Sequence, residues 1–286
     1  MFNHKRTKKM KLRFLSMAVA MSVAGVANAT PAWEGMSSGA TKTFTASGTV
    51  LGKEFSQKWE WAVGSGLQGL QGAISQTSKG GKIVIPVTQD TPILVGRTKV
   101  AFAVLFGSGV GAIPNISFID NNTPVKFMGG PKGYIEVGVY DSNSSKIGKA
   151  RLNLTAAAIA SQKNPALASA DLYSLYAGPG KIFDGGLGPD PVNTYLNGSE
   201  ALGVVTKLGG LSESAVKSQL GANAIVVKEN VRINEDMAYG AGWKVSASYA
   251  LGFMANQTIE VTFDAGKKPA STTNWSASLG IQVTYN

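Results

Sequence analysis

Cysteine is absent from this chain of 286 residues, and histidine occurs only once, as His4. Disulfides therefore cannot compensate for a thin core, although a chain of this length can bury a large fraction of its surface without them. After His4 the chain contains neither His nor Cys. It therefore cannot form a Ser-His-Asp triad, a cysteine nucleophile, or a zinc or copper site built from His or Cys. We therefore predict no metal centre, no cofactor and none of these enzyme classes.

Acidic residues are also few, with 17 Asp and Glu against 27 Lys and Arg. A glycosidase needs two convergent carboxylates, and no motif here supplies such a pair, so we predict that the protein is not an enzyme. Six basic and no acidic residues fall within the first 29, and subtracting these six from the net charge of +10 leaves +4. Because the remaining chain has no dense cluster of Lys and Arg, nucleic acid is not an expected partner.

Only one long apolar run is present, and it lies near the beginning of the chain. A basic stretch from Lys5 to Arg13 precedes about 13 apolar residues from Phe14 to about Val26, followed by Ala27 and Ala29 around Asn28. The run is shorter than the about 20 residues that span a bilayer. This pattern predicts a secretory signal peptide over residues 1–29, and therefore export.

The rest of the chain alternates apolar and polar residues in short runs that are separated by Gly, Asn, Asp and Pro. In Thr258–Phe263, for example, Ile259 and Val261 point to one face and Glu260 to the other. This spacing is typical of antiparallel strands in a sandwich, so the predicted fold class is mainly β. We predict strands at residues 58–63, 82–88, 93–95, 115–119, 134–140, 151–155, 224–227, 244–251, 258–263 and 279–285.

One region breaks this pattern. Residues 156–161 and 166–176 are rich in Ala and Leu, which favours helices, and a further short helix is predicted over 211–220 between Ser212 as N-cap and Gly221. A Gly-rich loop over 177–197 lies between them. We interpret residues 156–221 as an insertion into the sandwich, where a binding function is often placed.

The last predicted strand places Leu279, Ile281, Val283 and Tyr285 on one face. It is compatible with an ordinary final strand. A second interpretation is a subunit of a chaperone–usher pilus, since such subunits end in an alternating strand with a penultimate Tyr. Their sandwich lacks one strand, and a periplasmic chaperone covers the resulting groove and sheet edge, which would otherwise aggregate.

Residues 30–52 carry the complementary feature. This segment is rich in Gly, Ser and Thr, which is typical of a disordered tail, yet Phe44, Ala46, Gly48 and Val50 recur at a spacing of two. A donor strand that fills a neighbouring subunit's groove explains both the composition and the alternation. Because each such contact runs head to tail, repetition among copies of the subunit gives an open fibre.

Eight collinear stretches resemble the family of the K88 (F4) fimbrial major subunit and adhesin. They are QKWEWAVGSGL (57–67), PILVGRTKVAFA (92–103), DLYSLYA (171–177), IFDGGL (182–187), EDMAYG (235–240), SASYALG (246–252), QTIEVTF (257–263) and WSASLGIQVTY (275–285). The resemblance implies an incomplete immunoglobulin-like β-sandwich completed by donor-strand exchange. Its implied domains are the signal peptide (1–29), the donor extension (30–52) and the pilin domain (53–286).

The resemblance also implies partners and a location. The expected partners are other copies of the subunit, a periplasmic chaperone, an outer-membrane usher and host glycans that contain galactose. The protein would pass through the periplasm to a fimbria on the cell surface. A minor fimbrial subunit without glycan binding and a secreted lectin-like module are the alternative functions.

Candidate glycan contacts follow from the same resemblance. Tyr176 matches a family aromatic associated with galactosides, and an aromatic ring can stack on the apolar face of a sugar. Lys181 and Asp184 are the polar candidates nearby, whereas the competing interpretation packs Tyr176 on the sandwich. Trp59 and Trp61 lie on one face of a strand and are predicted to be core residues.

Overall fold

The computed structural model describes residues 34–35, 40–43, 57–73, 82–105, 112–119 and 124–286. The predicted signal peptide lies outside these residues. The described chain is mainly β, as predicted, with two short α-helices. Its elements are β1 (Glu34–Gly35), β2 (Ala40–Thr43), β3 (Trp59–Val63), β4 (Lys82–Pro86), β5 (Thr91–Thr98), β6 (Val104–Leu105), β7 (Pro114–Phe118), β8 (Lys126–Phe127), β9 (Lys132–Asp141), β10 (Lys146–Lys163), β11 (Ser169–Tyr176), the 3-10 helix η2 (Pro191–Asn193), α1 (Gly198–Lys207), α2 (Glu213–Leu220), β12 (Ala224–Asn234), β13 (Ala238–Tyr239), β14 (Lys244–Phe253), β15 (Thr258–Phe263), β16 (Trp275–Ser276) and β17 (Gly280–Tyr285).

All ten predicted strands are present, with ends that differ by a few residues except in the longer β5, β10 and β12. The period-two pattern explains why they form. In β15 the side chains of Ile259 and Val261 are buried, while Thr258 and Glu260 are partly exposed. In β9 the buried residues Ile135, Val137 and Val139 likewise alternate with more exposed neighbours.

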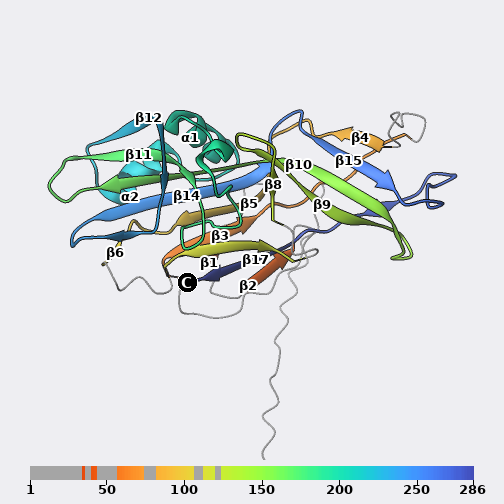
Figure 1. The fold of residues 1–286 in the computed structure, drawn as a ribbon, viewed down its shortest axis with the longest axis horizontal. Coiled ribbons are helices and arrows are strands. Elements are labelled where there is room, and N and C mark those ends of the chain that lie inside the picture. Colours follow the sequence, from red (N-terminus) through yellow and green to blue (C-terminus); the bar gives the residue numbers. More distant parts are fainter. Residues whose placement is uncertain (1–33, 36–39, 44–56, 74–81, 106–111, 120–123) are drawn as a thin grey trace, which may run out of the picture.

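The described strands form one large sheet, a smaller three-stranded sheet that packs on it, and a two-stranded sheet of β6 and β13. The main path of the large sheet runs β1-β3-β5-β14-β10-β11-β12, and β10 connects its two ends because it is 18 residues long. The first half of β10 pairs with β9 and β15, and its second half pairs with β14 and β11. In Figure 1, β9, β10, β15 and β4 extend toward the right-hand end of the molecule.

The helices expected over 156–161 and 166–176 are wrong, because residues 156–161 belong to β10 and residues 169–176 form β11. The alanines of β10 lie in the middle of the sheet and are buried on both faces. Ala156, Ala158 and Ala160 belong to one core, whereas Ala157 and Ile159 belong to the other. Small side chains suit this double burial, and tertiary packing overrides the helix propensity of alanine. Residue 156, the expected start of the insertion, therefore falls within a strand of the large sheet.

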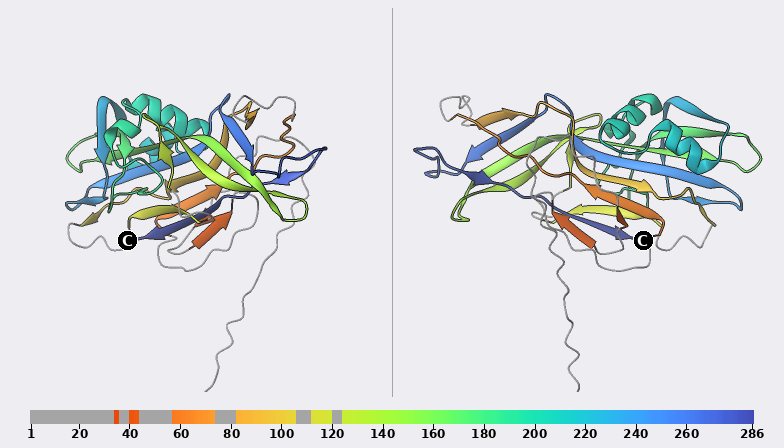
Figure 2. Two further views of the ribbon diagram at one scale, coloured as in Figure 1. Left: turned by 45° about the vertical axis from the view of Figure 1, so that its right-hand side comes forward. Right: turned by 180° about the vertical axis from the view of Figure 1, so that it is seen from behind.

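The helix predicted near residue 211 is confirmed as α2. The Ser212 hydroxyl accepts a hydrogen bond from the backbone N–H of Ala215 at 3.3 Å, and Gly221 ends the helix in the left-handed region with φ 58°. The helix α1 was not predicted. Both helices cover one face of the large sheet (Figures 1 and 2), where they bury a second apolar cluster around Ala157, Leu172 and Val205.

The smaller sheet lies on the opposite face and has the order β2-β17-β7 (Figure 2). Between the two sheets, Trp59 and Trp61 are fully buried, which confirms their prediction as core residues. Phe183 inserts from a loop between them, with edge-on contacts at ring-centroid distances of 5.4 Å to Trp59 and 6.1 Å to Trp61. Tyr249 completes the aromatic cluster, 5.3 Å from Phe183.

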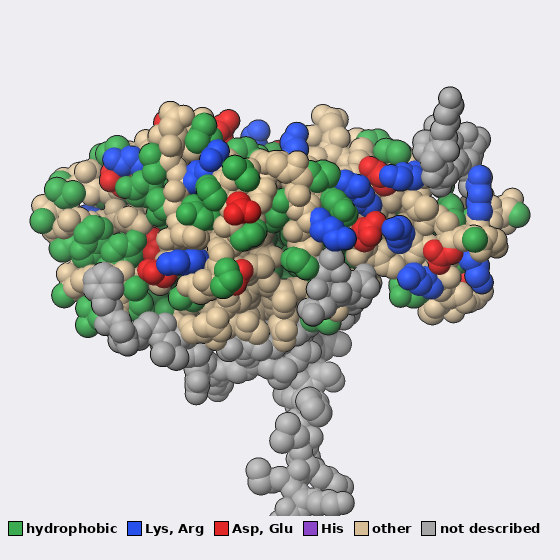
Figure 3. Space-filling model, in the orientation of Figure 1, with side chains coloured by type: hydrophobic (Ala, Val, Ile, Leu, Met, Phe, Trp, Pro, Cys, Tyr) green, Lys and Arg blue, Asp and Glu red, His purple; other side chains and the backbone are tan. Residues whose placement is uncertain are grey.

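The outward face of β4, β15, β10 and β9 carries charges of both signs, as Figure 3 shows at the right-hand end. Lys82 pairs with Glu260 at 2.7 Å and Lys149 pairs with Glu136 at 3.0 Å. This mixed face is typical of a solvated sheet surface. In the parts of the chain that the structure describes, no helix is both long and apolar enough to cross a membrane.

Candidate functional site

The last strand, β17, has a fully apolar inner face. Ile281 and Val283 are completely buried, Leu279 is 2% exposed and Tyr285 is 8% exposed. Gln282 and Thr284 lie on the other face and are partly exposed. The structure therefore places the four residues of the predicted chaperone-pairing strand on one buried face, as the alternation predicts.

Tyr285 is bound to the core at its polar end. Its hydroxyl accepts a hydrogen bond of 2.9 Å from the indole N–H of Trp61 on β3. Burial raises the pKa of the Tyr285 hydroxyl, and the hydrogen bond from Trp61 offsets only part of that rise. The penultimate Tyr thus joins the smaller sheet to the large one in addition to any role at the sheet edge.

Both edges of β17 are paired. On one side β17 is antiparallel to β7, with Ile281 opposite Phe118 and Val283 opposite Ile116. On the other side it is antiparallel to β2 of the same chain, over the four pairs from Gly280 opposite Thr43 to Val283 opposite Ala40. Sequence reasoning missed this intrachain pair.

The strand β2 lies within the predicted donor extension, residues 30–52. The predicted donor residues Phe44, Ala46, Gly48 and Val50 lie outside the described residues. The register of β2 nevertheless determines which residue numbers face which side, because even-numbered residues of β2 pair with odd-numbered residues of β17. In a strand that continues this register, even positions lie on the same face as Ile281 and Val283, which is the buried one.

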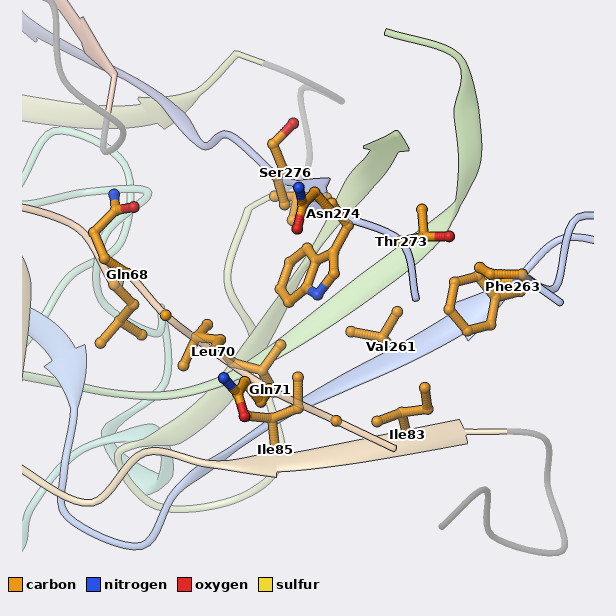
Figure 4. A pocket seen from close by; sticks show the side chains of 18 of the residues that line it. Gln68, Leu70, Gln71, Ile83, Ile85, Val261, Phe263, Thr273, Asn274 and Ser276 are labelled. Atoms are coloured by element: carbon orange, nitrogen blue, oxygen red, sulfur yellow. The ribbon is translucent and has the colours of Figure 1, made fainter. Parts of the chain in front are cut away.

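A groove of about 1110 Å³ with an apolar floor is drawn in Figure 4, and its lining includes Leu279, the residue that precedes β17. Its floor is formed by β4 and β15, from which Ile83, Ile85 and Val261 point into it. One wall is the segment around Leu70, and the other is the segment that leads into β17, residues 269–279.

Charged side chains are lacking from the described lining of this groove, which consists of aliphatic, aromatic, amide and hydroxyl residues. Placing a charge there would cost desolvation energy without an ionic partner. A segment with small or apolar side chains at every second position suits such a floor, whereas an acidic or basic peptide does not. The groove therefore favours an uncharged extended strand as its occupant.

The three glycan candidates lie on or next to the loop after β11, but the described contacts do not join them. Tyr176 ends β11, is partly exposed and pairs with Asn234 of β12. The ammonium group of Lys181 forms an ion pair of 2.8 Å with Asp236 instead. The backbone carbonyl of Asp184 accepts a hydrogen bond of 2.8 Å from Ile116 N–H on β7.

The carboxyl group of Asp184 is partly buried, and this burial raises its pKa, while a hydrogen bond from Gly185 N–H lowers it in part. Asp184 takes this position because the preceding residue, Phe183, packs in the aromatic core and holds the loop against it. Asp184 is therefore a loop residue next to the smaller sheet, and a sugar contact for it stays a prediction.

Sequence reasoning also missed a buried carboxylate at Glu235, which is 1% exposed. Its carboxylate accepts hydrogen bonds from Gln162 at 2.7 Å, Tyr239 at 2.8 Å and the backbone N–H of Met237 at 2.6 Å. The stretch EDMAYG (235–240), one of the eight that resemble the family, contains Glu235, Met237 and Tyr239 and was the one feature of the sequence that pointed to this cluster. The described residues, including those around Glu235, contain no group of three or more His, Cys, Asp or Glu side chains that could hold a metal ion.

Comparison with known proteins identifies the family. The sequence profile described as "Fimbrial, major and minor subunit", that of the K88 fimbriae, matches residues 8–286. The K88 fimbrial protein AD of Escherichia coli is 35% identical over 291 residues, which cover 96% of this chain and all of that protein. The K88 fimbrial proteins AC and AB of the same organism are each 34% identical, again over 96% of this chain and all of theirs. The chain therefore belongs to the K88 family of fimbrial subunits, and it is a structural protein of a surface fimbria.

Proposed function

We propose that this fimbrial subunit polymerises by donor-strand exchange at the β2 edge of β17. In this proposal, the N-terminal segment of one subunit pairs with β17 of the next and fills the groove beside it. The contact is heterologous and does not close on itself, so the product is a fibre. The observation that carries the proposal is an uncharged groove with an apolar floor, whose lining includes Leu279, the residue that precedes the buried apolar face of β17.

The chemistry of the predicted donor supports the same proposal. Main-chain hydrogen bonds to β17 would supply affinity, and alternate side chains would supply specificity through the groove. Phe44 and Val50 are the large apolar residues of the predicted donor, while Ala46 and Gly48 between them are small. Their even numbering is the parity that β2 establishes for the buried face.

Before assembly, the proposed partner at this edge is a periplasmic chaperone that pairs with Leu279, Ile281, Val283 and Tyr285. An outer-membrane usher would then exchange the chaperone for the donor strand of another subunit. Such a partner would protect this edge whenever β2 does not cover it, because an unpaired apolar strand edge is a template for aggregation.

Two charge substitutions test the proposal in bacteria that express the full subunit with its chaperone and usher. Phe44→Asp and Val50→Asp would place a carboxylate against the buried apolar face of β17 or the groove, and they are expected to abolish fibres, seen by electron microscopy, while leaving chaperone complexes intact. Thr45→Asp and Thr49→Asp introduce the same charge at positions of opposite parity and are the matched controls. Normal fibres from both groove variants would overturn the proposed donor segment.

A further inference from the structure

The edge of β17 that the proposed exchange requires is occupied by the chain's own β2. The four residues Ala40–Thr43 pair with Gly280 to Val283, so that β17 is the central strand of a three-stranded sheet within one chain. A free edge beside an apolar groove would be open to nonspecific pairing. The cis pairing of β2 covers part of that edge before any second subunit is present.

Two features make β2 a weak cover. Within the described residues it makes four register pairs with β17, from Gly280 to Val283, and none of them involves the flank of the groove at residues 269–279. At the register positions opposite Val283 and Ile281 it supplies Ala40 and Lys42, a small residue and a charged one. The buried face of β17 favours large apolar residues, whereas Ala40 is small and Lys42 is charged.

The residues that follow in the sequence would match β17 better. A shift of the register by four places Phe44 and Ala46 opposite Val283 and Ile281. The shift must be an even number, because a slip of one residue would turn the apolar set to the outer face. The covalent connection of β2 to the rest of its own chain restricts the register that it can take. A segment from a second subunit is not restricted in this way and can take the better register.

We propose that β2 is a cis cap: in a subunit that is neither in the fibre nor bound to the chaperone, residues 40–43 cover the edge of β17, and the donor segment of a neighbouring subunit displaces them. The displacement step rests on the proposed donor-strand exchange, whereas the cis pairing itself does not. The cap keeps an isolated subunit from pairing nonspecifically, and its poor match with β17 lets a neighbour replace it.

Cysteine cross-linking tests the cap without interference, because the natural chain has no cysteine. Thr41 lies opposite Gln282 in the register, and antiparallel partners have Cα atoms about 4.5 to 5.5 Å apart, within the span of a disulfide. The variant Thr41→Cys with Gln282→Cys is refolded without chaperone, and the monomer is isolated by size exclusion and mildly oxidised. An intrachain disulfide is then scored by nonreducing electrophoresis and peptide mapping.

Two matched variants calibrate the result. Ser117 of β7 lies opposite Gln282 on the other edge, so Ser117→Cys with Gln282→Cys should cross-link in the folded chain whether or not β2 is in place. Thr41→Cys with Ser117→Cys places the cysteines on the two sides of β17, about 9 to 10 Å apart, which is too far for a disulfide. The cap predicts an intrachain yield for the Thr41 and Gln282 pair close to that of the first control. A yield no higher than that of the second control would overturn it.

An assembly experiment with the oxidised monomer then tests the displacement of β2 separately from its cis pairing. Locked by its disulfide, this monomer should join fibres as an acceptor only after reduction, at a rate at least about tenfold higher than before reduction, if β2 must leave β17. Equal assembly before and after reduction would overturn the displacement step, and with it donor-strand exchange at this edge. The cross-linked monomer would in that case still establish the cis pairing, so the two failures are distinguishable.

Discussion

The indole N–H of Trp61 donates a hydrogen bond of 2.9 Å to the hydroxyl of Tyr285, which lies 224 residues later in the chain. Trp61 belongs to β3 of the large sheet and Tyr285 to β17 of the smaller one. The bond therefore connects the two layers of the sandwich in a site from which water is excluded. Any substitution of Tyr285 that is designed to probe chaperone pairing also acts on this core contact.

Tyr285→Phe should lower the stability of the isolated subunit. The substitution keeps the ring but removes the acceptor of the buried Trp61 N–H, and loss of such a partner costs about 1–3 kcal/mol. The free energy of unfolding, measured by urea denaturation, should fall by that amount. Tyr140→Phe is the control, because Tyr140 lies on the outer face of β9 and is 41% exposed. Equal stability of the two variants would contradict the role of the buried hydrogen bond.

Tyr285→Ser should in addition weaken the complex with the chaperone and lower the periplasmic yield, because it removes a large apolar group from the proposed pairing face. The comparison with Tyr285→Phe separates the two effects. Pairing with the chaperone predicts a larger loss of complex for Ser than for Phe, after correction for the stability of each variant. An unchanged yield for Tyr285→Ser would remove this strand from the chaperone interface.

Gly96→Ala should destabilise the large sheet. A Cβ atom at this position would overlap the indole ring of Trp61, which packs directly against Gly96. Overpacking of a close-packed core costs about 1–3 kcal/mol, so the urea midpoint should fall. Gly178→Ala is the matched control, because a Cβ atom there would meet nothing within 4 Å. A stable Gly96→Ala variant would show that Trp61 can move away, contrary to its tight packing.

Glu235 should give the subunit a stability that decreases as the pH rises through the raised pKa of this residue. Burial raises the pKa of this carboxyl above its ordinary value of 4.5, although the hydrogen bonds from Gln162, Tyr239 and Met237 N–H oppose the rise. The folded state then holds a proton that the unfolded state releases, so the contribution is complete below about pH 4.5 and is lost as the pH rises through the raised pKa. Glu235→Gln should remove this decline from a series of melting temperatures between about pH 3 and pH 7.

Asp236 should behave in the opposite way. Burial acts to raise the pKa of its carboxyl, but the hydrogen bond and charge of Lys181, with a hydrogen bond from Ala238 N–H, lower it below the ordinary value of 3.8. Its contribution to stability is present above about pH 3.8 and is lost as the pH falls through the lowered pKa. Asp236→Asn should therefore flatten the acid side of the same pH series. Slopes that change in the same direction in Asp236→Asn and Glu235→Gln would contradict these assignments.

A glycan array decides whether Tyr176 contacts a sugar. If the ring stacks on galactose-containing glycans, Tyr176→Ala should lower binding by about tenfold or more, since an aromatic stacking contact contributes about 0.5–1.5 kcal/mol beyond its buried area. Tyr173→Ala, three residues earlier on β11, is the matched control. Equal binding by the wild type and the Tyr176 variant removes the stacking proposal and favours a minor subunit without glycan binding.

The parts of the fold that could be predicted are those with a local signal. The alternation of Ile259, Glu260 and Val261 is visible in the sequence, and so are the Ser212 cap and the Gly221 stop of α2. The strand character of residues 156–160 was not predictable from local composition, because alanine favours helices and only the neighbours on both faces of β10 decide the outcome.

The candidate site divides along the same line. The shared buried face of Leu279 to Tyr285 follows from a period of two, whereas the hydrogen bond to Trp61 and the cis pairing with β2 join residues more than 200 positions apart. No spacing rule reports such contacts. The interpretation of Lys181 as a sugar ligand likewise lacked the information that Asp236, 55 residues later, binds its ammonium group.

The central claim is that β17 of one subunit pairs with the N-terminal segment of another, and cross-linking between two different subunits tests it most directly. One subunit carries only Gln282→Cys, and the other carries only one cysteine, at Thr41, Thr43, Thr45 or Ser47, so that even shifts of register are included. Both are co-expressed with chaperone and usher, and fibres sheared from the cells are analysed by nonreducing electrophoresis. Donor-strand exchange predicts a covalent dimer that joins the two kinds of subunit for at least one of these positions. Fibres that contain both subunits but give no such dimer at any of the four positions would contradict it.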